Sequence, residues 1–164
     1  DVTHDGGTLK IEPLKNFPII SDLVVDMSRF YLDMDKIGFP QVGEVSVVDK
    51  PFEVNDQDPS SYERLVDCIE CGLCISVCPA AATSSTYFGP AVLAAAELTL
   101  NLNKDLCVID LVDNKDGAWR CHSAFECSAV CPSHVDPAWR IMHLRRKIIQ
   151  NRLSSFFSRK EATK

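Results

Sequence analysis

Two cysteine motifs constrain this chain more than any other feature of its sequence. The first, C-I-E-C-G-L-C-I-S-V-C-P, runs from Cys68 to Pro79, and the second, C-H-S-A-F-E-C-S-A-V-C-P, runs from Cys121 to Pro132. The second motif repeats the ending of the first but has Ala124 where the second cysteine would fall. Together they hold seven of the eight cysteines, in a chain without secretory features. Such spacings indicate metal ligation in a reducing compartment rather than a disulfide framework.

The first motif is typical of iron-sulfur binding. A cubane cluster needs thiolates from several directions, and C-x2-C-x2-C wraps three corners while a distant cysteine supplies the fourth. In ferredoxins with two clusters, the fourth cysteine of such a run binds the other cluster. The predicted ligand sets are therefore Cys68, Cys71, Cys74 and Cys131 for a [4Fe-4S] cluster, and Cys78, Cys121 and Cys127 for a second cluster. Because Ala124 has no donor atom, we expect the second cluster to be [3Fe-4S].

Zinc is the main competing interpretation, because it also binds four thiolates and often uses C-x2-C pairs. Two such pairs would be needed, whereas the first motif is a triple followed by C-P and the second contains no C-x2-C. The spacing thus favours iron-sulfur clusters over a structural zinc module. The eighth cysteine, Cys107, is expected to be a small buried apolar residue. His122 directly follows a predicted ligand, where it could donate a hydrogen bond or only pack.

Charge is unevenly spread along the 164 residues, which carry a formal net charge of -6. Residues 1–136 have nine basic and 22 acidic side chains, whereas residues 137–164 have eight and one. An acidic body does not suit nucleic acid. The basic end could meet anionic lipid or an acidic partner, or could form a solvated helix face. No stretch approaches the roughly 20 apolar residues of a bilayer span, so we expect contact with a membrane only from its surface or through a partner.

The N-terminal part is predicted to be an arm followed by one helix. Alternating residues from Thr8 to Leu14 predict one short strand, and no later segment is a convincing partner for it. We therefore expect this strand to complete a sheet that another polypeptide or an N-terminal domain supplies. A helix is predicted from Asp22 to near Gly38.

The remainder is predicted to be helical around the cysteine motifs. After an acidic connector over residues 41–59, helices are expected over residues 62–67, from Pro90 to about Leu100, and from Pro137 to about Arg152 with Asp136 as N-cap. The predicted fold class is mainly α, an α-helical ferredoxin domain with two iron-sulfur clusters. The predicted divisions are an arm (residues 1–20), a helix with its connector (21–59) and the cluster domain (60–164).

From Thr8 to about Leu153 the sequence resembles the iron-sulfur subunit of succinate dehydrogenase and fumarate reductase, respiratory complex II. The stretches that carry the resemblance are K-I-E-P-L-K-N-F-P-I-I-S-D-L-V-V-D-M-S-R-F-Y, C-I-E-C-G-L-C-I-S-V-C-P, Y-F-G-P-A-V-L-A-A-A and R-C-H-S-A-F-E-C-S-A-V-C-P-S-H-V-D-P. The resemblance implies the same ligand sets and an electron relay. Electrons from a flavin that oxidises succinate would pass through [2Fe-2S], [4Fe-4S] and [3Fe-4S] centres to a membrane quinone.

The resemblance also implies partners and a location. The quinone-contacting positions of the family fall on Pro79 and His122. A flavoprotein subunit and membrane anchor subunits would complete the assembly. It would lie peripherally on the matrix face of the mitochondrial inner membrane or on the cytoplasmic face of a bacterial membrane.

Two departures from the family, and one alternative family, remain open. Family members normally begin with a plant-type ferredoxin domain that holds [2Fe-2S], so we expect a split subunit with that domain on a separate chain, although a truncated product would look the same. Residues 80–83 lack the tryptophan of ubiquinone-using members, which leaves the quinone type open. Subunits of the heterodisulfide reductase or anaerobic glycerol-3-phosphate dehydrogenase type are the alternative, but these normally complete the second motif.

Overall fold

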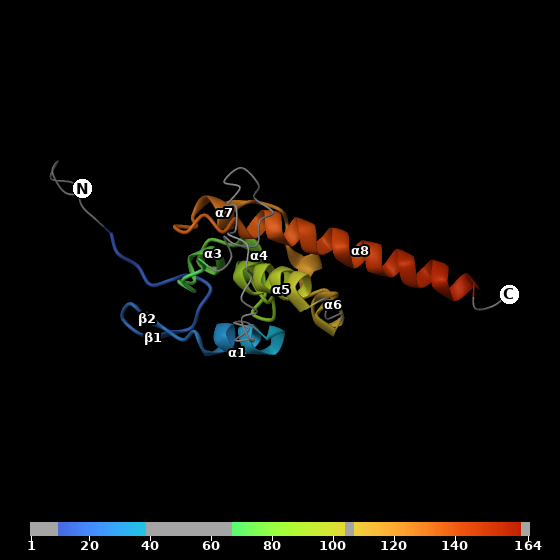
Figure 1. Ribbon diagram of the computed structural model, residues 1–164. Coiled ribbons are helices and arrows are strands. Elements are labelled where there is room, and N and C mark those ends of the chain that lie inside the picture. Colours follow the sequence, from blue (N-terminus) through green and yellow to red (C-terminus); the bar gives the residue numbers. More distant parts are fainter. Residues whose placement is uncertain (1–9, 39–66, 104–106, 162–164) are drawn as a thin grey trace, which may run out of the picture.

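A computed structural model of the chain describes residues 10–38, 67–103 and 107–161. These residues are mostly helical, as predicted, with one small sheet (Figure 1). In chain order the elements are β1 (Ile19–Ser21), β2 (Val24–Val25), α1 (Ser28–Ile37), α3 (Leu73–Ser76), α4 (Pro79–Thr83), α5 (Pro90–Asn103), α6 (Cys107–Val112), the 3-10 helix η1 (Ala118–Arg120), α7 (Glu126–Ala129) and α8 (Pro137–Glu161).

Helix α5 is the centre of the core, and α1, α3, α6 and α8 pack against it (Figure 1). Its residues Val92, Leu93, Ala94 and Ala96 have no exposed surface. A helix that is apolar on every side is stable only when its neighbours enclose it. The predicted helix therefore forms, beginning at Pro90, and its enclosure fixes the segments that carry the cysteines.

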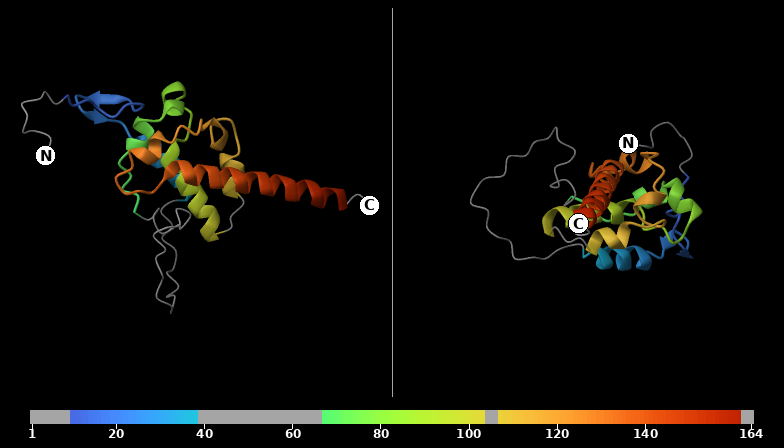
Figure 2. Two further views of the ribbon diagram at one scale, coloured as in Figure 1. Left: turned by 90° about the horizontal axis from the view of Figure 1, so that it is seen from above. Right: turned by 90° about the vertical axis from the view of Figure 1, so that its right-hand side faces the viewer.

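Helix α8 is the longest element and projects past the rest of the fold, away from the β1–β2 hairpin (Figure 2). Asp136 caps its start as predicted, since Oδ1 accepts a hydrogen bond from Trp139 N at 3.4 Å. Ile141, Leu144 and Ile148 face inward with no exposed surface. The helix continues past the predicted end at Arg152 because no glycine or proline follows to stop it. Among the described residues, none of the helices is both long and apolar enough to span a bilayer.

The N-terminal helix begins later than predicted. Residues 19–25 form an antiparallel hairpin in which Ile19 pairs with Val25 and Ser21 pairs with Val24. Asp22 has φ 51°, a left-handed conformation that suits a turn, and the β-branched residues on each side favour strands. Helix α1 therefore begins at Ser28, and it ends as predicted at Gly38, which is left-handed with φ 77°.

The predicted strand from Thr8 to Leu14 is only partly described. Residues 10–14 belong to no strand, and residues 8 and 9 lie outside the described ranges. Completion of another chain's sheet stays a prediction, as does the division into three segments. The predicted connector over residues 41–59 and almost all of the predicted helix over residues 62–67 also lie outside the described residues.

A buried ion pair joins α5 to α8. Glu97 Oε2 accepts a hydrogen bond from Arg140 Nη1 at 3.2 Å, and both side chains are at most 2% exposed. Glu97 Oε1 also accepts from Lys147 Nζ at 2.9 Å and from Asn101 Nδ2 at 2.7 Å. The carboxylate thus compensates two cations of α8. Removing one partner of a buried pair is costly because it leaves the other charge uncompensated.

We expect Glu97→Ala to lower the free energy of unfolding by about 3 kcal/mol, because Arg140 would stay buried without its carboxylate partner. Denaturant unfolding of the intact protein measures the change. Asp35→Ala removes an exposed carboxylate from α1 and should change stability by less than about 0.5 kcal/mol. Equal effects of the two substitutions would contradict the assigned role of the α5–α8 ion pair.

Candidate metal centres

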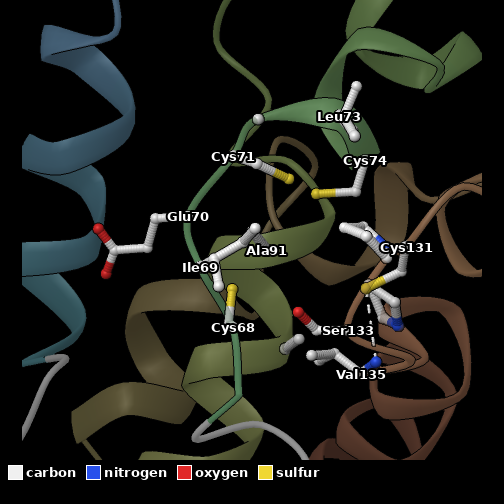
Figure 3. A pocket seen from close by; sticks show the side chains of 14 residues that line it. Cys68, Ile69, Glu70, Cys71, Leu73, Cys74, Ala91, Cys131, Ser133 and Val135 are labelled. Atoms are coloured by element: carbon white, nitrogen blue, oxygen red, sulfur yellow. Dashed lines mark hydrogen bonds between the residues drawn. The ribbon is translucent and has the colours of Figure 1, made fainter.

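Four of the predicted ligands line one pocket, and they come from both motifs. Cys68 and Cys71 lie on the loop that leads into α3, Cys74 lies in α3, and Cys131 lies just after α7. Their sulfur atoms face a common space, whereas Glu70 points away from it (Figure 3). The structure thus places the last cysteine of the second motif beside the first three cysteines of the first motif.

The second pocket gathers the other three predicted ligands. Cys78 stands at the N-terminus of α4, Cys121 follows η1, and Cys127 lies in α7. All three line this pocket together with Ala124, and none of them lines the first pocket. Ala124 presents a methyl group here, so this pocket has three thiols where the first pocket has four.

The two motifs have matching backbone conformations. Glu70 and Gly72 of the first motif have φ 52° and 74°, and Ser123 and Phe125 of the second have φ 56° and 63° at the equivalent positions. Each motif then forms a four-residue helix, α3 or α7, and these two helices pack together. Ala124 therefore occupies the position that Cys71 has in the first motif.

Gly72 needs both its conformation and its small size. Its φ of 74° is unfavourable for residues with a Cβ atom, and a Cβ there would lie 3.1 Å from Met27 Cε and 3.2 Å from Phe17. The N-terminal segment thus packs directly against the first cysteine loop. The adjacent Asn16 side chain supports this contact, since its Nδ2 donates to Ile75 O at 2.8 Å.

Burial of the thiols raises their pKa values. For Cys74 the pKa is raised to about 12, first by burial and then by the neighbouring Cys127, Cys68 and Cys71. For Cys127 it is also raised to about 12, by burial and then by Cys121 and Cys78. Thiols in such an environment stay protonated at neutral pH unless a cation compensates the charge of the thiolates. A thiol-only set of this kind fits an iron-sulfur cluster, whose irons supply that charge.

The metal-binding side chains of the described residues do not converge on a single metal ion. No three His, Cys, Asp or Glu side chains among them could hold one metal ion. Tetrahedral zinc at Zn–S 2.3 Å would bring its thiolates within about 3.8 Å of one another. A cluster keeps its thiolates farther apart because each of them binds a different iron.

Hydrogen bonds hold the ligand segments in place. Ser123 N donates to Cys121 Sγ at 3.4 Å, and Val135 N donates to Cys131 Sγ at 3.4 Å. Arg145 of α8 donates to Ala118 O at 2.9 Å and also to Cys121 O, so it fixes the segment that ends at Cys121. Sequence reasoning missed Arg145, because no spacing relates a residue of α8 to a cysteine loop so far away in the chain.

The remaining predicted residues have mixed outcomes. Pro79 and His122 both line the second pocket, and the His122 side chain is exposed. The prediction for Cys107 is wrong, since this residue is exposed at the start of α6. The inward side of α6 is already filled by Val108, Ile109 and Val112, which leaves its first residue on the surface.

The two thiol-lined pockets and the repeated loops are typical of an iron-sulfur protein, and comparison with known proteins agrees. A family model described as "4Fe-4S dicluster domain" matches residues 64–135. The "Fumarate reductase iron-sulfur subunit" of Mycobacterium tuberculosis is 33% identical over 144 residues, covering 85% of this chain and 58% of that protein. The protein of the same name from Haemophilus influenzae is 37% identical over 147 residues, covering 80% and 57%.

A relative named as a succinate dehydrogenase subunit is similar over a comparable length. The "Succinate dehydrogenase iron-sulfur subunit" of Coxiella burnetii is 30% identical over 156 residues, covering 85% of this chain and 61% of that protein. The chain therefore belongs to the family of fumarate reductase and succinate dehydrogenase iron-sulfur subunits, as its motifs predicted. It spans less than two thirds of the length of these relatives.

In the native protein we expect iodoacetamide to modify Cys107 at least about tenfold faster than Cys74 or Cys127 at pH 8. Cys107 is exposed, whereas burial raises the pKa of Cys74 and Cys127 to about 12 and depletes their reactive thiolates. Peptide mass spectrometry after timed alkylation measures the rates. Faster modification of Cys74 or Cys127 would contradict the burial of these two thiols.

Proposed function

We propose that this chain is the electron-transfer subunit of a succinate:quinone oxidoreductase. Cys68, Cys71, Cys74 and Cys131 would hold a [4Fe-4S] cluster, and Cys78, Cys121 and Cys127 would hold a [3Fe-4S] cluster. The observation that carries the proposal is the division of the seven motif cysteines into two pockets that each draw on both motifs. When bound, each cluster would accept and release one electron.

The chain's own residues would hold the two centres close together. Helices α3 and α7 are in contact, and Cys127 contributes to the raised pKa of Cys74 across the boundary between the pockets. Apolar side chains around them exclude water, which lowers the local dielectric constant and makes the potential of each centre sensitive to nearby dipoles. Such proximity supports transfer from one centre to the other without chemistry on the protein itself.

The second pocket would be the exit toward the quinone. Pro79 and His122 line it, and the His122 side chain is exposed. An imidazole there can donate a hydrogen bond to a quinone carbonyl. Because the pocket has only three thiols, the corner next to Ala124 stays without a protein ligand, which supports [3Fe-4S] as its occupant.

The proposed partners are a flavoprotein subunit, membrane anchor subunits and a plant-type ferredoxin domain with [2Fe-2S], predicted on a separate chain. The hairpin offers an apolar surface for that domain, since Ile19, Ile20 and Val24 are 62%, 66% and 59% exposed. The proposed location is peripheral, on the matrix face of the mitochondrial inner membrane or the cytoplasmic face of a bacterial membrane. Succinate oxidation and fumarate reduction are both compatible with this assembly.

Electron paramagnetic resonance of the purified assembly tests the two centres, because oxidised [3Fe-4S] and reduced [4Fe-4S] give separate signals. We expect Cys78→Ser to abolish most of the [3Fe-4S] signal and to keep the [4Fe-4S] signal, although Cys78 lies in the first motif. Cys107→Ser is the matched control and should keep both signals, since Cys107 lines neither pocket. Selective loss of the [4Fe-4S] signal in Cys78→Ser would refute the crossed ligand sets.

A second experiment tests the quinone exit. We expect His122→Gln to slow quinone reduction by succinate at least about tenfold, because it removes a proton-donating imidazole beside the second pocket. Both cluster signals and the reduction of a dye at the flavin should stay as in the parent. His143→Gln, which removes the imidazole that stacks on Trp139, is the control. Unchanged quinone kinetics in His122→Gln would remove His122 from the proposed site.

A further inference from the structure

The second half of α8 has an apolar side that the core does not use. Ile148 is the last buried residue of the described part of α8, and beyond it the helix runs past the rest of the described fold (Figure 2). Ile149, Leu153 and Phe156 follow and are 46%, 53% and 57% exposed. Their spacing of four and three residues places them on one side of the helix, with Ser154 on the opposite side. A helix in water is polar on every side, so this apolar side indicates a surface that covers it.

The exposed apolar side continues the side of α8 that contacts the loop of the second pocket. Met142 Sδ accepts a hydrogen bond from Ser123 Oγ at 3.5 Å, and Ser123 lines that pocket together with the exposed His122. Met142 and Ile149 are about two helical turns apart, so they share a side of the helix. The apolar side therefore faces the same way as the contact between α8 and the second pocket, which is where the proposed quinone exit meets the membrane.

Charge selects an anionic surface as the one that covers this side. Residues 137–164 have eight basic and one acidic side chain, whereas residues 1–136 have nine and 22. An anionic bilayer attracts the basic helix and repels the acidic body, so α8 is the part of the chain that it would hold. Arg146 is exposed one turn before Ile149, at the border of the apolar side, with its guanidinium 5.7 Å from the centre of the Trp139 ring. An apolar side bordered by arginine is typical of helices that lie in a membrane interface.

We propose that the side of α8 formed by Ile149, Leu153 and Phe156 lies on the surface of a bilayer that contains anionic lipid, an inference that rests on the proposed function for the position of the membrane. The apolar side chains enter the boundary between headgroups and acyl chains. Arg146 reaches the lipid phosphates from the border of this side, while its aliphatic stem stays with the apolar side chains. The contact holds the second pocket at the surface from which a membrane quinone is reached.

Flotation of the full chain, loaded with its clusters, on lipid vesicles tests this surface. Vesicles of equal parts phosphatidylcholine and phosphatidylglycerol are the anionic probe, and phosphatidylcholine alone is the neutral one. We expect binding to the anionic vesicles that weakens as salt screens the charges. Leu153→Ser should lower the partition coefficient about tenfold, because the exposed part of the leucine no longer leaves water. Leu32→Ser, at a leucine of α1 that is 58% exposed, is the matched control and should bind as the parent does.

A second substitution tests the charge separately from the apolar contact. Arg146→Gln should weaken binding to the anionic vesicles about fivefold and leave binding to the neutral ones unchanged, since one basic side chain near an anionic surface contributes about that factor. Lys115→Gln removes an exposed lysine outside α8 and is the matched control, with no expected change. Equal binding of Arg146→Gln and the parent to anionic vesicles would overturn the phosphate contact.

Fluorescence quenching tests which side of α8 enters the lipid. Phe156→Trp and Ser154→Trp each add one indole to the two tryptophans of the parent, on opposite sides of the helix. In anionic vesicles with brominated acyl chains, we expect quenching of the added emission in Phe156→Trp and little in Ser154→Trp. Equal quenching of the two variants would overturn the proposed orientation.

Other occupants of this side give different results. A chain that self-associates through Leu153 and leaves the vesicles unbound has a second copy on this side, and a chain that binds only membrane anchor subunits in detergent has a protein partner there. Either result overturns the lipid contact. If the parent shows both cluster signals by electron paramagnetic resonance and binds no vesicles, this inference alone fails. If neither cluster signal appears, the proposed function fails, and the position that it gives the membrane fails with it.

Discussion

The cost of burying thiolates is the constraint on which the rest of the structure depends. Burial raises the pKa values of Cys68, Cys74, Cys78 and Cys127, so the arrangement is favourable for thiolates only where a cationic group joins them. The enclosing helices create this condition, because α5 and α8 hold the cysteine loops against an apolar core. Metal binding and folding are coupled in such a site, since the same contacts that exclude water also make the ligands need a metal.

Repetition with one difference explains how a small chain could hold two unlike electron carriers. The loops before α3 and α7 have the same left-handed residues at equivalent positions, so their backbones set the same ligand geometry twice. Each pocket draws on both loops, which ties the two centres to the contact between α3 and α7. Within these matching loops, Ala124 in place of a cysteine leaves the second pocket with three thiols and keeps the same backbone conformation.

The surroundings of the second pocket add further differences that the repeat does not share. Arg145 reaches from α8 to the loop around Cys121. A charged donor to the ligand loop is a means of stabilising a reduced cluster. The exposed His122 side chain lines the second pocket, which supports the proposed exit toward an external acceptor there.

Several features were predictable from the sequence, because each depends on a local pattern or on ligand geometry within one loop. These are the convergence of the motif cysteines, the fold class, the helix after Pro90, and the start and inward face of α8. Other features required the tertiary structure. The hairpin at residues 19–25 replaced the start of a predicted helix, because β-branched residues around a left-handed Asp22 outweighed the apolar spacing. Cys107 is exposed because its neighbours fill the inward side of α6. Arg145 meets the loop at Cys121 through packing between segments distant in the chain, and such a contact leaves no periodic signal in the sequence.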